Sequence, residues 1–216
     1  MKSGVNIVLI GPAGSGKGTQ AELIGNYLKL KRVTIGDVIR SEINSNSDLG
    51  KKIKNAINSG KLLPSSVALL FVKRSIKGRT TGFVFDGFPR LLNEAKDLDK
   101  ILKVSFVFIL SISNSIVIKR LNDRRLCKCG ADYNLLTSKP KKDNLCDVCR
   151  SKLYKRDDDN PASIKKRLEI YKHDTLPVVE YYKKKGIAHI IDASKPVRTV
   201  FSEIKKVLNN ALGDEL

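Results

Sequence analysis

The sequence has no long apolar run, no low-complexity tract and no internal repeat. None of its hydrophobic segments approaches the roughly 20 residues that a membrane-spanning helix needs. No extended Pro- or Ser-rich stretch interrupts a chain that is 41% hydrophobic. Membrane spans, disordered chains and repeat arrays are therefore not expected. The 216 residues suit one domain of ordinary size, with a substantial core and room for a small insertion.

Histidine and acidic residues are also scarce. The two histidines, His173 and His189, stand in no catalytic or metal-binding pattern, so we expect structural or surface roles for both. Lysine and arginine number 41 against 22 acidic residues, a formal net charge of +19. This excess raises nucleic acid as a partner, but the lysines are spread along the chain, which favours a solvated basic surface. We expect a monomer with no obligatory nucleic acid and no membrane partner.

Cysteine occurs only four times, and all four lie within 23 residues, at Cys127, Cys129, Cys146 and Cys149. The N-terminal segment leads at once into a short apolar run, so we expect no cleavable signal and a cytoplasmic protein. In a cytoplasmic chain, clustered cysteines indicate a metal site and not disulfides.

A glycine-rich loop at Gly11–Thr19 follows the apolar run Val5–Ile10 and precedes a helical stretch at Gln20–Leu30. Strand, loop and helix in this order are the context of a phosphate-binding P-loop. The glycines let backbone N–H groups turn inward around a polyphosphate, and the helix adds its N-terminal dipole. Lys17 is expected to reach the transferable phosphates, and Thr19 to serve the magnesium shell. The predicted ATP-binding residues in the loop are Gly14, Ser15, Gly16, Lys17, Gly18 and Thr19.

A second motif, Asp86–Arg90, follows a short apolar run that ends at Phe85. An aspartate at the carboxyl end of a buried strand beside a P-loop can hold magnesium through water. Gly87 and Pro89 predict a tight turn from which the arginine projects.

The P-loop variant, Gly36-Asp37, Gly60-Lys61-Leu62 and Asp86–Arg90 occur in the order and spacing of adenylate kinases, which the chain therefore resembles. The resemblance implies a three-layer α/β/α P-loop fold on a five-stranded parallel sheet with two inserted mobile subdomains. It implies a core of residues 1–33, 64–125 and 158–216, a monophosphate-binding flap of residues 34–63 and a lid of residues 126–157. The implied reaction is reversible, magnesium-dependent transfer of the terminal phosphoryl group of ATP to AMP, giving two ADP.

The resemblance also implies roles for residues outside these motifs. Arg120 and Lys195 would lie at the ATP base, and Arg124 at the ATP phosphates. The implied AMP-binding residues are Ile35, Arg40, Leu63, Gly87, Arg90, Glu94, Arg156 and Arg167. The implied catalytic set around the moving phosphoryl group is Lys17, Arg90, Arg124, Arg156 and Arg167, with Asp158 and Asp159 orienting the arginines or holding the lid shut. Because the acceptor is already an anionic oxygen, positioning and charge stabilisation suffice and no general base is needed.

Several local predictions come from the residue pattern itself. Arg120 and Arg124 are four residues apart in a helix predicted from about Ser113, so we expect them to share a face and converge on a nucleotide. Judged without the resemblance, the acidic run at 157–159 is typical of a helix N-terminal cap. Toward the C-terminus we expect a helix over Tyr171–Lys185 interrupted near Pro177, a strand at Ile187–Ile191 and a closing helix at Val197–Leu212.

Glu94 departs from the family pattern, which has a glutamine that reads the adenine of AMP. A carboxylate can accept a hydrogen bond from the exocyclic amine of adenine but cannot donate to ring N1. The family's threonine beside the base is likewise Ile35 here, although Asn93 could supply an amide. GMP is therefore an alternative acceptor, unless Glu94 is turned aside from the base.

The cysteine cluster resembles the metal-bearing lid of some adenylate kinases. Four thiolates can close a tetrahedral, structural zinc site, which would stabilise an excursion too small for its own core. The first knuckle is Cys127-Lys128-Cys129, one residue shorter than the usual Cys-x-x-Cys. The shortening strains the turn in which backbone amides bond the first thiolate, so a degenerate lid with a vacant site is the alternative. A protein of another class, a basic P-loop protein whose zinc ribbon holds nucleic acid, is the third hypothesis.

Overall fold

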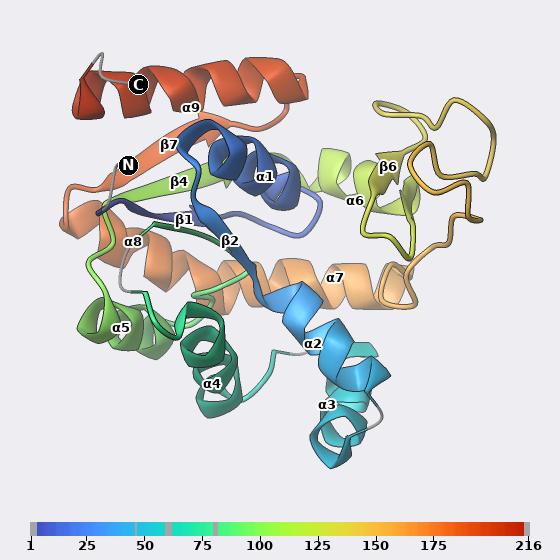
Figure 1. Ribbon diagram of the computed structural model, residues 1–216, viewed down its shortest axis with the longest axis horizontal. Coiled ribbons are helices and arrows are strands. Elements are labelled where there is room, and N and C mark those ends of the chain that lie inside the picture. The colour runs from blue at the N-terminus through green and yellow to red at the C-terminus, as the bar shows by residue number, and fades with distance from the viewer. Residues whose placement is uncertain (1–3, 46, 59–61, 80–81, 214–216) are drawn as a thin grey trace.

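The structure is a computed structural model that describes residues 4–45, 47–58, 62–79 and 82–213. Its main element is a five-stranded sheet in the order β2-β3-β1-β4-β7 (Figure 1), and every neighbouring pair is parallel. The strands are β1 (Asn6–Ile10), β2 (Lys31–Thr34), β3 (Phe83–Asp86), β4 (Phe106–Ser111) and β7 (Ala188–Asp192). The α/β fold class and the five-stranded parallel sheet are confirmed.

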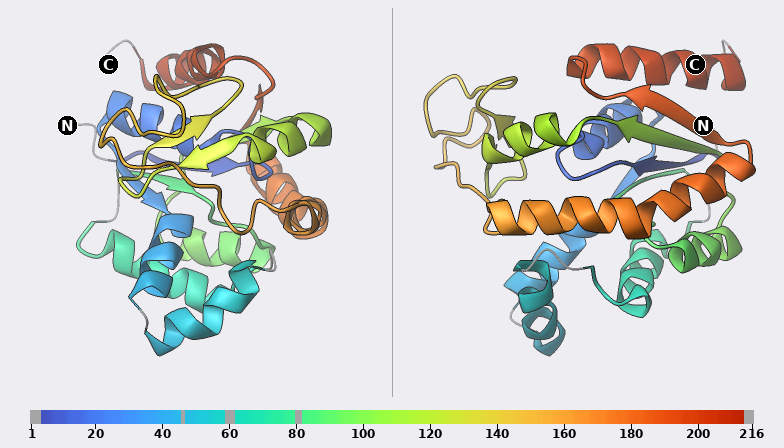
Figure 2. Two further views of the ribbon diagram at one scale, coloured as in Figure 1. Left: turned by 90° about the vertical axis from the view of Figure 1, so that its right-hand side faces the viewer. Right: turned by 180° about the vertical axis from the view of Figure 1, so that it is seen from behind.

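Helices cover both faces of the sheet (Figures 1 and 2). One face carries α1 (Lys17–Leu28) and α9 (Val197–Leu212), and the other carries α4 (Ser65–Ile76), α5 (Leu92–Ile101) and α8 (Leu176–Lys184). Successive β1 side chains alternate between the two cores, because Ile7 and Leu9 pack with α1 and α9 while Val8 and Ile10 pack on the opposite side. Strand β1 is the middle strand of the sheet and is buried along its whole length. The loop that follows it therefore lies near the middle of the sheet.

The segment after β2 forms two short helices, α2 (Ile35–Asn44) and α3 (Asp48–Asn58), which project beyond the sheet in Figure 1. They cross closely at Gly50, where a Cβ would lie 2.3 Å from the Glu42 carbonyl oxygen. Any larger residue at position 50 would push the helices apart. Gly60 and Lys61 of the predicted Gly-Lys-Leu motif lie outside the described residues.

A long excursion leaves the core after α6 (Asn114–Asn122) and returns at α7 (Pro161–Ile170). Its regular part is an antiparallel pair, β5 (Arg124–Leu126) and β6 (Asp132–Asn134). Figures 1 and 2 place this excursion at the end of the molecule away from both chain termini. Figure 1 shows that the loop between β1 and α1 opens toward the same end of the molecule.

The prediction that Arg120 and Arg124 share a helix face is wrong. The helix α6 ends at Asn122, and Arg124 is the first residue of β5. Asp123 ends the helix because the chain turns there into the β5–β6 pair, whose backbone pairing replaces the helical hydrogen bonds. The spacing of four residues therefore carries no geometric meaning here.

The long helical segment formed by α7 and α8 is interrupted between them by a π-helical turn, η1 (Tyr171–Thr175). The Leu176 amide bonds to the Tyr171 carbonyl, five residues back, as in a π-helix. Pro177 follows in the first turn of α8, where its missing N–H breaks the α-helical pattern. The predicted interruption is confirmed, just ahead of the proline, and the last strand and closing helix are also confirmed.

None of the helices in the described part of the chain has the length and apolar character to span a bilayer.

Candidate active site

The loop between β1 and α1 has the geometry of an anion cradle. Gly14 and Gly16 take φ values of 77° and 94°, which side chains other than glycine rarely adopt. A Cβ at Gly14 would lie 3.0 Å from Leu121 Cγ, so close packing also requires glycine. The buried hydroxyl of Ser15 has no hydrogen-bond partner among the described residues. A buried polar atom without a partner at the opening of α1 fits a phosphate oxygen.

Lys17 curls back over this loop. Its Nζ donates to the carbonyl oxygens of Gly11 and Pro12, each at 2.8 Å. Burial lowers the pKa of Lys17 to about 8, the carboxylate of Asp86 opposes that shift, and nearby arginine charges add to it. The ammonium group therefore lies where anionic phosphate would relieve both its desolvation and the repulsion from its neighbours.

Asp86 lies against the P-loop, as the sequence predicts. It is the last residue of β3 and is in register with Leu9 of β1. A Cβ at Gly18 would lie 3.4 Å from Asp86 Oδ2, which measures how closely the carboxylate approaches the loop. Thr19 lies exposed in the first turn of α1. A carboxylate beside a phosphate cradle has the oxygen chemistry that Mg²⁺ prefers.

Three arginines from separate segments meet at two buried aspartates. Arg124 of β5 donates to Asp159 through Nε and Nη2, at 2.8 and 2.7 Å. Arg156 donates to Asp158 in the same two-pronged way, at 2.7 and 2.6 Å. Arg167 of α7 bridges the two carboxylates, at 2.8 Å to Asp158 and 2.9 Å to Asp159.

This cluster, the arginine–aspartate cluster, is pre-ordered and carries a net positive charge. Burial alone would raise the pKa of Asp158, but the charges and hydrogen bonds of Arg156 and Arg167 outweigh it and lower that pKa. Three guanidinium groups against two carboxylates leave one excess positive charge for an anion. The N-terminal cap of α7 is Asn160, whose side chain accepts from the Ser163 amide at 2.9 Å. Asp158 and Asp159 therefore pair with arginines, and the alternative that the acidic run caps the helix is wrong.

The turn after β3 holds Arg90 by its backbone and by its side chain. Arg90 Nε donates to the Gly87 carbonyl at 2.9 Å, and its amide donates to Glu94 Oε2 at 2.8 Å. Gly87 has φ of 82°, and a Cβ there would lie 3.2 Å from Arg90 Nη2. Burial lowers the pKa of Arg90, and charges on Asp86, Glu94, Arg167 and Arg156 also act on it. Arg90 thus lies within electrostatic reach of both the P-loop aspartate and the arginine–aspartate cluster.

Glu94 is buried and turned toward the protein backbone. Its Oε2 accepts from the amides of Arg90 and Leu91, at 2.8 and 3.2 Å, and closes the first turn of α5. Burial raises the pKa of Glu94, while these amides and a hydrogen bond from Ser65 oppose the rise. Asn93, the other candidate for an amide contact, donates to the Ser65 hydroxyl at 3.0 Å. The hydrogen bonds of Glu94 thus have a local structural purpose.

The remaining predicted AMP residues lie around α2. Arg40 forms a short hydrogen bond to Asp37, which also pairs with Arg32 at 3.0 Å. Ile35 and Leu63 are both buried in the core on the α4 side of the sheet. The structure thus gives Arg40 a carboxylate partner near the protein surface and gives the two apolar residues a packing role.

Arg120 and Lys195, the predicted base-side residues, are brought near one another. Arg120 Nη2 donates at 3.3 Å to the carbonyl of Ser194, the residue before Lys195. Lys195 Nζ forms a 2.7 Å ion pair with Glu203 of α9. Arg124 of β5 instead pairs with Asp159.

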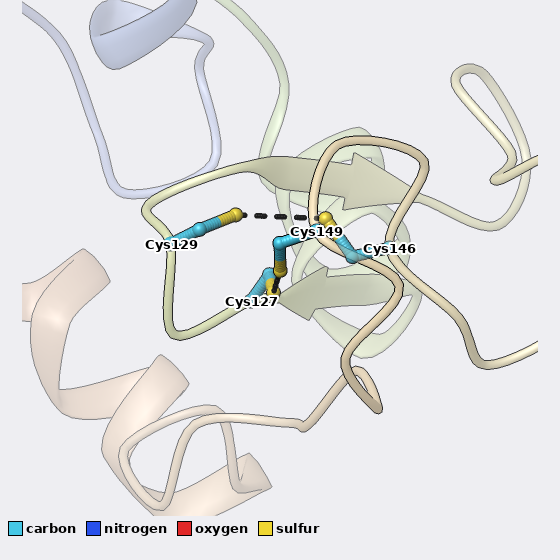
Figure 3. Close-up of side chains that lie close together, drawn as sticks. All are labelled: Cys127, Cys129, Cys146 and Cys149. Carbon is cyan, nitrogen blue, oxygen red and sulfur yellow. Dashed lines mark hydrogen bonds between the residues drawn. The ribbon is translucent and has the colours of Figure 1, made fainter.

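The four cysteines meet in the excursion between α6 and α7 (Figure 3). Their sulfur atoms all lie within 4.8 Å of one another, with Cys127–Cys149 at 3.3 Å and Cys129–Cys146 at 3.5 Å. A tetrahedral zinc ion with Zn–S bonds of about 2.3 Å needs sulfur atoms about 3.8 Å apart. The four thiols therefore fit such an ion with small adjustments.

The short first knuckle still has a backbone hydrogen bond to its first thiol, which we expected the shortening to strain. The Cys129 amide bonds to the Cys127 thiol, and Gly130 completes the turn with φ of 90°. Burial alone would raise the pKa of the Cys146 thiol, but the Cys149 and Val148 amides and the Tyr133 hydroxyl lower it to about 6. A lowered pKa favours the thiolate of Cys146, the form that binds metal, whereas burial and hydrogen bonds with the other three sulfur atoms raise the pKa of Cys127.

Comparison with known proteins agrees with this geometry. The family model described as adenylate kinase matches residues 9–187. A protein named adenylate kinase from Caldanaerobacter subterraneus subsp. tengcongensis is 39% identical over 218 residues, covering 97% of each chain. Others with this name, from Methanosarcina mazei and Methanothrix thermoacetophila, are 36% and 37% identical, covering 94% and 95% of this chain and 98% and 99% of theirs. The chain belongs to the adenylate kinase family.

Proposed function

We propose that this protein catalyses the reversible transfer of the terminal phosphoryl group of MgATP to AMP, giving two ADP. The observation that carries the proposal is the meeting of a P-loop lysine, a strand-end aspartate and preordered arginines at one end of a parallel sheet. Phosphoryl transfer requires in-line positioning and stabilisation of charge more than covalent chemistry. The family membership supports the same reaction over the two alternatives, a GMP kinase and a nucleic-acid-binding protein.

In this proposal the P-loop binds the donor and the turn after β3 binds the acceptor. The amides of Gly14–Thr19 and the Ser15 hydroxyl hold the ATP phosphates, and Lys17 moves from its loop carbonyls onto them. Arg120 and the backbone at Lys195 lie at the ATP base. Arg40 and Arg90 receive the phosphate of AMP, and Ile35, Leu63, Gly87 and Glu94 shape that side of the site.

The arginine–aspartate cluster stabilises the charge on the moving phosphoryl group. Asp158 and Asp159 hold the guanidinium planes of Arg124, Arg156 and Arg167 before substrate arrives, so little reorganisation is needed during transfer. These residues lie where the excursion leaves and rejoins the core. Closure of residues 126–157 as a lid, and of residues 34–63 as a flap, would exclude the water that could otherwise hydrolyse ATP.

Two metals belong to the proposal. Asp86, through water, and Thr19 would hold Mg²⁺, which neutralises phosphate charge. Cys127, Cys129, Cys146 and Cys149 would hold a structural Zn²⁺. Because four thiolates fill a tetrahedral shell, the zinc site has no open position for substrate and serves stability alone.

Specificity for AMP over GMP provides the first test. We expect kcat/KM to be higher for AMP than for GMP in the wild type and in Glu94→Gln alike, because Glu94 is occupied by the amides of Arg90 and Leu91. The substitution should cost about 1 kcal/mol of unfolding free energy, because the hydrogen bonds from the two amides become bonds to a neutral acceptor. Initial rates of ADP formation with each monophosphate and a denaturant titration measure both. A GMP preference that Glu94→Gln converts to an AMP preference would instead assign base recognition to Glu94.

Zinc content provides the second test. We expect purified protein to carry about one zinc ion per chain, and a strong chelator to lower Tm by at least about 5 °C, which corresponds to roughly 2 kcal/mol for a chain of this size. Metal analysis and thermal unfolding with and without chelator measure this. The matched control is Cys146→Ser, which removes a buried ligand and should be zinc-free, with a Tm that the chelator does not change. A metal-free wild type with an unchanged Tm would refute the zinc site.

A further inference from the structure

The π-helical turn η1 contacts the backbone of Arg90 in the turn after β3. Thr175, its last residue, is buried, and its hydroxyl donates at 3.0 Å to the backbone carbonyl of Arg90. A threonine within a helix commonly bonds a carbonyl one turn back in its own helix. Here the bond instead joins segments 85 residues apart in the sequence.

This bond completes the support of Arg90. The Arg90 amide donates to Glu94 Oε2 of α5, and its side-chain Nε donates to the Gly87 carbonyl in the turn after β3. The Thr175 hydroxyl adds a third hydrogen bond, which ties Arg90 to the layer formed by α7 and α8.

The helix geometry explains why an interruption occurs at this point. A π-helical turn inserts one residue relative to an α-helix, which shifts the direction of the side chains that follow it. The turn η1 spans Tyr171–Thr175, directly between Arg167 of the arginine–aspartate cluster on α7 and the start of α8. One continuous helical layer therefore holds Arg167 at one point and the backbone of Arg90 at another.

We infer that Thr175 is a positioning residue for Arg90, and that the π-helical turn sets the position of the acceptor-binding arginine relative to Arg167. The inference rests on the proposed function, in which Arg90 receives the phosphate of AMP. Thr175 does not touch substrate. Its effect should therefore appear in AMP binding and transfer, and not in ATP binding.

The test compares Thr175→Val, which keeps the shape and removes the donor, with Thr175→Ser, which keeps the donor. We expect Thr175→Val to lower kcat/KM for AMP by about 3- to 10-fold, the effect of one net hydrogen bond, with KM for ATP changed less than twofold. Thr175→Ser should recover most of the loss. Thr199→Val, in the exposed first turn of α9, is the matched control and should behave as wild type.

A double-mutant cycle with Arg90→Ala separates positioning from simple stabilisation. The Thr175 hydroxyl bonds the Arg90 backbone, so Arg90→Ala keeps that bond but removes the guanidinium to be positioned. In the Arg90→Ala background, Thr175→Val should leave AMP kinetics unchanged while still lowering Tm. If Thr175→Val proves too unstable to purify, Thr175→Ala is used in the same cycle.

Three outcomes would overturn the inference: unchanged AMP kinetics in Thr175→Val, equal losses for AMP and ATP, or the same loss with and without Arg90. Each presupposes that wild-type protein forms ADP from ATP and AMP. A wild type without that activity would instead count against the proposed function, so the two failures are distinguishable.

Discussion

Replacing Asp159 with asparagine should lower kcat by about 100-fold and the free energy of unfolding by about 3 kcal/mol. Asp159 is fully buried and accepts from both Arg124 and Arg167. Asparagine removes the negative charge and turns an amide N–H₂ toward a guanidinium, which leaves buried positive charge without its counter-ion. The arginines then lose the orientation that stabilises the transferring phosphoryl group, and loss of one such preorganised contact costs on the order of 10² in kcat.

Steady-state kinetics with saturating ATP and AMP, together with denaturant unfolding, measure both effects of Asp159→Asn. The matched control is Asp143→Asn, an exposed aspartate in the same excursion, which should change neither quantity appreciably. A kcat within about threefold of wild type in a folded Asp159→Asn protein would show that the arginine–aspartate cluster does not serve phosphoryl transfer.

Replacing Lys17 with methionine should lower kcat by about 10²- to 10³-fold with little change in stability. The ammonium group donates to two loop carbonyls and is partly uncharged at pH 8, because burial lowers its pKa to about 8. Its main value is therefore realised with phosphate, as charge stabilisation in the transition state. Lys165→Met, an exposed lysine of α7, is the matched control. Wild-type kcat in Lys17→Met would remove the lysine from the mechanism.

The pKa of Lys17 also gives a pH dependence with a definite sign. Below pH 8 the free protein holds Lys17 mostly as the cation that binds phosphate, and above pH 8 a proton must be taken up on binding. The Kd for ATP should therefore rise with pH above about 8, by at most tenfold per pH unit. The ATP phosphates stay ionised over this range, since their second pKa is about 6. Binding measured calorimetrically from pH 7 to 10 should lose this slope in Lys17→Met.

The local motifs could be predicted from the sequence because each is a short, contiguous pattern tied to one backbone geometry. The glycines of the P-loop specify the turn at Gly14 and Gly16, and the apolar run before Asp86 specifies a buried strand that ends at the loop. Four clustered cysteines likewise indicated a shared metal site, and the structure brings their sulfur atoms together.

Relations between distant segments could not be predicted in the same way. The spacing of Arg120 and Arg124 indicated a shared helix face, but the backbone leaves the helix at Asp123 to pair as a strand, a choice made by tertiary contacts. The place of Asp159 between two arginines was implied only by the family resemblance, and the contact of Thr175 with Arg90 depends on where whole elements pack. No residue pattern near Thr175 marks it as part of the site.

Phosphoryl transfer from MgATP to AMP is tested by the product balance when the protein is mixed with both nucleotides and the reaction is followed by phosphorus NMR. The proposed two-nucleotide site predicts two ADP formed for each ATP consumed, no inorganic phosphate, and approach to the same equilibrium from ADP alone. Release of inorganic phosphate without ADP derived from AMP would show that the P-loop serves hydrolysis or another acceptor, and would contradict the account.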